Sequence, residues 1–287
     1  MYADFYGFRE KPFTLQPDPR FLFLGRHHRR ALTLLEYGLV NESSFLLVTG
    51  EVGCGKTTLI RYLLSRLDDS VKVGLLSHTS RGSQRLLPWV CYSLGLESHS
   101  NEDAHLYEVL VAFLVEQYRA GHQVMLIVDE AQNLGLRGLE ELRLLSNISV
   151  DEHLLLQLVM VGQPELARLL QSRELRQVAQ RIGGEYHIGP MTQQETMHYV
   201  WHRLRVAGGP VSLFNRTALR MVHASSGGVP RLVNQLCDVA LLYGYTEQAS
   251  RIDEDLMETV IRDRCEGGVF PGLQVRLRHE REVRLPD

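Results

Sequence analysis

The segment from Ser43 to Leu59, SSFLLVTGEVGCGKTTL, decides the fold of this 287-residue chain. Its first part, Ser43–Thr49, is an apolar run that ends at a glycine, which predicts a short buried strand. Gly50–Thr57 matches the pattern GxxxxGK followed by Ser or Thr in full, and Thr58–Leu67 carries apolar residues at helical spacing. A chance match within a turn would not explain both the strand before the loop and the helix after it. We therefore interpret the segment as a phosphate-binding loop between a strand and a helix.

The residue types of this loop suit the binding of ATP and Mg²⁺. Glycines let backbone N–H groups approach phosphates closely, and the helix that follows turns its positive end toward them. Lys56 is expected to place its charge on the β- and γ-phosphates, and the Thr57 hydroxyl is expected to coordinate Mg²⁺. The predicted nucleotide-binding residues of the loop are Gly50, Glu51, Val52, Gly53, Cys54, Gly55, Lys56, Thr57 and Thr58.

A second part of the site follows another apolar strand, Val124–Val128, which ends in Asp129 and Glu130. Ligands of α/β folds bind at the carboxyl ends of strands. We expect Asp129 to hold Mg²⁺ through water and Glu130 to orient and polarise the attacking water. The alternative is that both are solvated carboxylates that cap a helix. Glu130 favours hydrolysis of the nucleotide over its retention in a switch or a nucleotide-gated scaffold.

Several polar residues further along the chain are candidates for a role at the γ-phosphate. Gln163 follows an apolar strand, so its amide could reach the phosphate or the water, or instead cap the helix at Pro164. Arg176 and Arg181 precede the last predicted strand, and either could supply charge to the nucleotide of an adjacent subunit or be a surface arginine. Arg231 opens a predicted helix and could report the nucleotide state, or be a surface charge at the helix start.

Strand and helix patterns alternate up to about residue 190, and only helix patterns follow. The alternation predicts a parallel sheet with helices on both faces. The predicted strands are residues 43–49, 71–77, 124–128, 154–161 and 184–188, and one predicted helix spans 165–178. We expect four parts, namely an aromatic, proline-rich arm that packs on a neighbouring domain (1–25), an α/β nucleotide-binding domain (26–190), a helical lid domain (191–264) and a basic tail (265–287).

Composition excludes several classes of protein. With 44% hydrophobic and 23% charged residues the chain is not disordered, and with a net charge of −3 it is not a general nucleic-acid wrapper. The 4 cysteines form no CxxC pair, which argues against a zinc site or a disulfide framework and favours the reducing cytoplasm. No apolar run reaches the ~20 residues of a membrane helix. Four arginines of the tail could bind DNA phosphates or belong to a solvated segment. These are Arg276, Arg278, Arg281 and Arg284.

Taken together, the motifs resemble those of AAA+ ATPases, and more narrowly those of the ExeA/GspA-like secretion ATPases. The resemblance covers residues 1 to about 264 and rests on a set of motifs whose combination is specific. Besides the glycine-rich loop, these motifs are FYGF (5–8), KPF (11–13), PDPRF (17–21), DEAQNL (129–134), LRLLSN (142–147), GQPEL (162–166) and GVPRLVN (228–234).

The resemblance implies a P-loop α/β core with a helical lid, with Mg-ATP bound between the two domains. It also implies a homo-oligomer, in a ring or a filament, in which an arginine of a neighbouring subunit completes the site. The implied function is a cytoplasmic ATPase that drives or regulates the assembly of an envelope secretion, pilus or protein-sorting machine through a membrane-associated partner. The alternative is a regulator of transposition similar to TnsC, with double-stranded DNA as its partner.

Two features depart from the family pattern. Cys54 stands where the family usually has threonine. Its thiol lies at a helix N-terminus, where ionisation would be favoured, although a small residue of any kind also fits this variable position. The full-length secretion form continues into a membrane segment and a peptidoglycan-binding domain, and this sequence shows neither, so we do not expect it to bind the cell wall directly.

Overall fold

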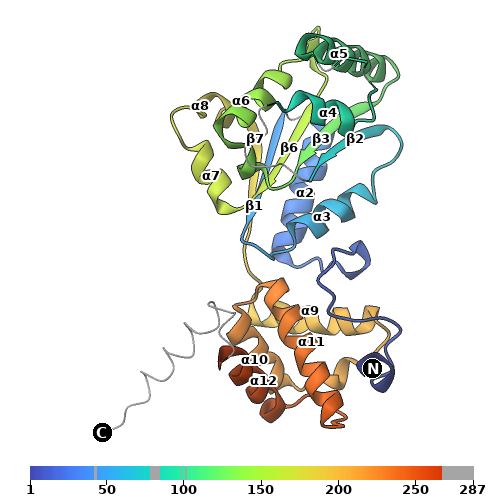
Figure 1. Ribbon diagram of the computed structural model, residues 1–287, viewed down its shortest axis with the longest axis vertical. Coiled ribbons are helices and arrows are strands. Elements are labelled where there is room, and N and C mark those ends of the chain that lie inside the picture. The colour runs from blue at the N-terminus through green and yellow to red at the C-terminus, as the bar shows by residue number, and fades with distance from the viewer. Residues whose placement is uncertain (42–43, 78–84, 98, 101, 267–287) are drawn as a thin grey trace. The chain divides into compact units, whose positions relative to one another are not determined.

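The structure is a computed structural model that describes residues 1–41, 44–77, 85–97, 99–100 and 102–266. These residues divide into two units (Figure 1). The α/β unit consists of Arg26–Val52 and Leu59–Ile188. The helical unit consists of Met1–Gly25, Gly53–Thr58 and the chain from Gly189 onward. Each unit has its own hydrophobic core.

A five-stranded parallel sheet forms the centre of the α/β unit. Its strands lie in the order β2-β3-β6-β1-β7. Their bounds are β1 Phe45–Gly50, β2 Val71–Leu76, β3 Gln123–Val128, β6 Gln157–Gly162 and β7 Ile182–Ile188. Strand β6 therefore lies between β1 and β3, which are the two strands that precede the predicted loop and the predicted carboxylates. The architecture confirms the predicted α/β class with a parallel sheet.

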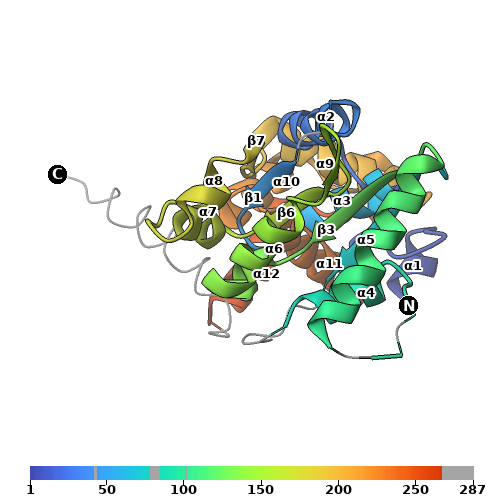
Figure 2. The ribbon, with the colours of Figure 1, turned by 90° about the horizontal axis from the view of Figure 1, so that it is seen from above.

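Helices cover both faces of this sheet, as they must where strands are apolar along their whole length. Leu46 faces α2, where a Cβ at Gly38 would lie within 2.3 Å of its side chain. Phe45 and Leu47 belong instead to the core with α4, α5 and α6. Figure 2 shows α2 on one side of the sheet and α4, α5 and α6 on the other. The helices of the α/β part of the chain are α2 Arg26–Val40, α3 Lys56–Leu64, α4 Leu87–Ser93, α5 Asp103–Arg119, η2 Ala131–Leu134, α6 Gly135–Leu145, α7 Pro164–Leu170 and α8 Arg176–Ala179.

Two predicted elements of this unit are wrong. The helix predicted over 165–178 is broken into α7 and α8, because Leu170 and Leu175 are both buried. Residues five apart lie on different faces of one helix, so a continuous helix would expose one of them. The strand predicted over 154–161 is shorter, because His153–Leu154 (β5) pairs with Ser149–Val150 (β4) in a separate antiparallel hairpin.

The helical unit is built from four longer helices and shorter turns. Its elements are α1 Tyr2–Phe5, η1 Pro19–Phe21, α9 Gln193–Val206, η3 Val211–Leu213, α10 Arg216–Ser226, α11 Pro230–Thr246 and α12 Glu254–Glu266. Thr192 and Glu195 form a capping box at the start of α9, where the Glu195 N–H donates to Thr192 Oγ1 at 3.2 Å. Asp253 caps α12 by accepting from the Leu256 N–H.

The N-terminal arm packs within this helical unit. Phe13 is 2% exposed and meets Phe214 edge to face. The buried Arg203 guanidinium donates to the carbonyl oxygens of Pro12 and Thr14, at 2.6 and 3.1 Å. One arginine of α9 therefore satisfies two carbonyls of an irregular segment whose prolines prevent a continuous helix.

Candidate nucleotide site

The glycine-rich loop leaves β1 at Gly50 and enters α3 at Lys56. Gly53 and Gly55 have φ values of +83° and +89°, in the left-handed region that side chains other than glycine rarely adopt. Glu51 and Val52 are exposed, whereas Cys54 is buried. Gly55 is therefore a fixed glycine of the motif that needs its backbone freedom, and Gly53 adds a second left-handed glycine at a variable position.

The first turn of α3 supplies the polar side chains of the loop. Lys56 is 5% exposed, and Thr57 and Thr58 are half-buried. A lysine this deeply buried is rare in proteins unless a partner compensates its charge. A helix N-terminus with a buried cation and left-handed glycines before it is an environment suited to phosphate. These residues fit the predicted ligand.

Arg231 lies in the first turn of α11, in the same unit as Gly53–Thr58. Its N–H donates to the Gly53 carbonyl oxygen at 3.1 Å, while its side chain is exposed. The fit of the two backbones is tight, because a Cβ at Gly53 would lie 2.5 Å from the Arg231 Cβ. The structure thus brings the backbone of Arg231 to the loop, and the role of its side chain at the γ-phosphate stays a prediction.

The predicted carboxylates and Gln163 lie at the carboxyl edge of the sheet. Thr49 of β1 is level with Gly162 of β6, and Val128 of β3 is level with Met160. Asp129, Gln163 and the start of the loop consequently leave three adjacent strands at one edge, which is where α/β folds bind ligands.

A hydrogen-bonded cluster forms at this edge. The Asp129 side chain is 5% exposed and its Oδ1 accepts from the Glu130 N–H at 2.9 Å. Glu130 Oε2 accepts from the side-chain amide of Gln163 at 2.9 Å and from that of Gln132 at 2.5 Å. The structure therefore joins the predicted Glu130 to the predicted Gln163 and adds Gln132, a residue of the DEAQNL motif to which the sequence analysis assigns no role.

The two candidate arginines for a neighbouring subunit differ in their surroundings. Arg181 is half-buried, and its guanidinium donates to Ser146 Oγ at 2.9 Å. Arg176 is exposed in α8. The tail arginines Arg276, Arg278, Arg281 and Arg284 lie outside the described residues.

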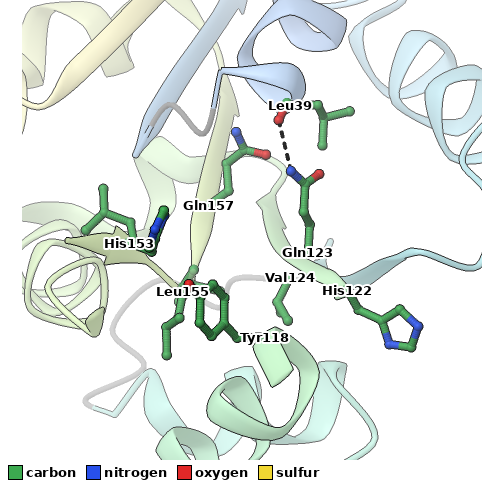
Figure 3. Close-up of a pocket in the computed structure, with 10 residues that line it drawn as sticks. Leu39, Tyr118, His122, Gln123, Val124, His153, Leu155 and Gln157 are labelled. Atoms are coloured by element: carbon green, nitrogen blue, oxygen red, sulfur yellow. Dashed lines mark hydrogen bonds between the residues drawn. The ribbon is translucent and has the colours of Figure 1, made fainter. Parts of the chain in front are cut away.

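Other features of the described chain lie away from this site. A small cavity of about 50 Å³ lies at the amino ends of β3 and β6, beside Gln123, whose amide donates to the Leu39 carbonyl oxygen (Figure 3). Within the described residues no three His, Cys, Asp or Glu side chains gather as a metal site would require. None of the described helices has the length and apolarity needed to span a membrane.

Comparison with known proteins agrees with this geometry. Residues 40–170 match a family described as AAA domain. General secretion pathway protein A of Aeromonas hydrophila is 40% identical over 253 residues, which cover 88% of this chain and 46% of that protein. The chain thus spans about half the length of this relative.

Solved structures share the fold at low sequence identity. The Aeropyrum pernix ORC2 protein, solved as ADPNP–ADP complexes, superposes with a TM-score of 0.67 at 17% identity, over 88% of this chain and 71% of that one. The Thermotoga maritima RuvB Holliday junction branch migration motor has a TM-score of 0.53 at 18% identity, over 88% and 72% of the two chains.

The sheet order and the loop after β1 define a P-loop protein of the AAA+ class. Within that class, the chain belongs to the ExeA/GspA-like family, to which its motifs and its 40% identity with general secretion pathway protein A assign it.

Proposed function

We propose that this chain binds Mg-ATP at the glycine-rich loop and hydrolyses it to ADP and phosphate. The observation that supports this most strongly is the placement of β1, β6 and β3 side by side, with the loop, Gln163 and the Asp129–Glu130 pair at their carboxyl ends. Within the α/β unit, the hydrogen bond from Gln163 to Glu130 at 2.9 Å supports a joint role for the side chains at these strand ends.

Each residue has a role that its chemistry suits. The loop N–H groups and Lys56 bind the phosphates, and Arg231 contacts the γ-phosphate. Thr57 and Asp129 hold Mg²⁺, which when bound neutralises charge on the phosphate oxygens. Glu130 accepts a hydrogen bond from the attacking water and so raises the nucleophilicity of that water. Gln163 orients the same water molecule.

A neighbouring copy of the chain completes the site with an arginine. Arg176 is exposed, and Arg181 is half-buried with its guanidinium on Ser146, so both are candidates for this role. A mixing experiment distinguishes action within one subunit from action between subunits. Arg176→Ala and Glu130→Gln proteins, each slow alone, should regain turnover when mixed if Arg176 acts on the neighbour's nucleotide. The same mixture made with Arg181→Ala tests the other arginine, and a mixture that gains nothing in either case argues against action between subunits.

The wider role that we propose is to drive or regulate the assembly of a cell-envelope secretion, pilus or protein-sorting machine, from the cytoplasm and through a membrane-associated partner. Its support is the identity with general secretion pathway protein A over 88% of this chain. ATP turnover and sedimentation, with and without double-stranded DNA at low and moderate salt, test this proposal. We expect the rate of ATP turnover to be the same with and without DNA. DNA-stimulated turnover with large ATP-dependent assemblies would favour a regulator of transposition instead.

A further inference from the structure

Gln132 connects two strand ends that are far apart in the sequence. Its Nε2 donates to Glu130 Oε2 at 2.5 Å, and its Oε1 accepts from the backbone N–H of Gln163 at 3.2 Å. The side-chain amide of Gln163 donates to the same Glu130 oxygen at 2.9 Å. Gln132 therefore holds the Glu130 carboxylate and, at the same time, the residue that provides its second amide donor.

The chain makes room for this bridge at Gly162. A Cβ at this position would lie 2.6 Å from Gln132 Oε1, closer than real Cβ contacts come. The last residue of β6 thus has no side chain at the place where the Gln132 carbonyl must pass to reach Gln163. A surface glutamine would need no such gap.

The backbone of Glu130 explains why its side chain needs an anchor. Its φ is +53°, in the left-handed region that is unfavourable for a residue with a long side chain. Amide donors from Gln132 and Gln163 then select one orientation of the carboxylate among the rotamers that a glutamate can adopt.

We propose that Gln132 is a positioning residue for hydrolysis, acting through Glu130. The amide of Gln132 fixes the Glu130 carboxylate in the orientation that accepts the proton of the attacking water, and its carbonyl keeps Gln163 in register with it. This inference rests on the proposed function, since it assigns Gln132 a role only if Glu130 polarises the water.

The first test compares Gln132→Ala and Gln132→Met with the wild type in steady-state ATP turnover. Methionine fills the volume of glutamine but donates no hydrogen bond. Both variants should lower kcat by about 10- to 100-fold, the usual effect of removing a group that orients a reacting side chain. KM and the affinity for a non-hydrolysable ATP analogue should stay within about twofold. Gln194→Ala, an exposed glutamine of α9, is the matched control and should turn over ATP at the wild-type rate.

The second test places Gln132→Ala in a Glu130→Gln background. If Gln132 acts through Glu130, the double variant should be as slow as Glu130→Gln alone, because effects within one functional unit are not additive. If Gln132→Ala instead lowers kcat in the Glu130→Gln background by the same factor as in the wild type, Gln132 does not act through Glu130.

The outcomes separate this inference from the proposed function. A Gln132→Met protein with wild-type kcat overturns the inference, because it would leave Gln132 only a packing role. If Glu130→Gln is slow and Gln132→Ala is fully active, the inference fails alone. If Glu130→Gln is itself fully active, the inference falls together with the proposed role of Glu130.

Discussion

Replacement of Gly53 by alanine should weaken ATP binding through the backbone alone. Gly53 has a φ of +83°, and a residue with a Cβ adopts this left-handed conformation at a cost of about 1–2 kcal/mol. The added methyl would also lie 2.5 Å from the Arg231 Cβ, about 1 Å closer than carbon atoms normally pack. We expect the free loop to relax into another conformation to avoid both costs.

Nucleotide binding must then restore the original loop, so the cost appears as lost affinity. A cost of 1–2 kcal/mol corresponds to a factor of about 5–30 in an equilibrium constant. We therefore expect Gly53→Ala to raise the Kd for ATP by at least this factor, with the contact to Arg231 adding to the effect. Titration with a fluorescent ATP analogue measures the Kd directly.

Gly121→Ala is the matched control for this prediction. Gly121 has a φ of +76°, but a Cβ there would meet no atom within 4 Å. The control should thus lose stability in urea unfolding by a similar 1–2 kcal/mol and bind ATP normally. If Gly53→Ala binds ATP as well as the wild type while Gly121→Ala is destabilised, the loop conformation is not what binds the phosphates.

Two further predictions concern the helical unit. Phe13→Ala should lower the free energy of unfolding by about 3–5 kcal/mol, because Phe13 is 2% exposed and its ring packs on Phe214. An unchanged midpoint of urea unfolding would show that the N-terminal arm does not stabilise this core. Burial, with Arg203 and Arg205 nearby, lowers the pKa of His202 below its ordinary 6.5, against a hydrogen bond with the Leu22 backbone. Protonation then favours the unfolded state, so stability should fall as the pH drops below 6.5, and a His202→Gln protein should show a smaller loss of Tm between pH 7.5 and 5.5 than the wild type.

The sequence predicts the α/β part well because its signals are local. Apolar runs of strand length mark the buried strands, and the glycine-rich loop marks both the end of one strand and the start of a helix. The break between α7 and α8 is different. It exists because Leu175 finds a place in the core, and no residue between Leu170 and Leu175 is a glycine or a proline that would announce a break.

The site shows the same distinction between local and tertiary signals. Lys56, Asp129 and Glu130 are predicted from the residues beside them along the chain. Gln132 becomes a neighbour of Gln163 only when β3 and β6 pair, so its side chain gains its partners from tertiary structure. A glutamine two residues beyond a strand-end glutamate could raise this hypothesis from sequence, but only the strand order makes it specific.

The most direct test of the account is phosphate release from Mg-ATP by the wild type and by Glu130→Gln, with nucleotide affinity measured on the same preparations. Loss of a group that polarises the attacking water costs about 100-fold or more in rate. We predict that the wild type hydrolyses ATP and that Glu130→Gln binds it equally well but turns it over at least about 100-fold more slowly. Equal rates in the two proteins would contradict the account, as would a wild type that binds ATP in an assembled state and releases no phosphate.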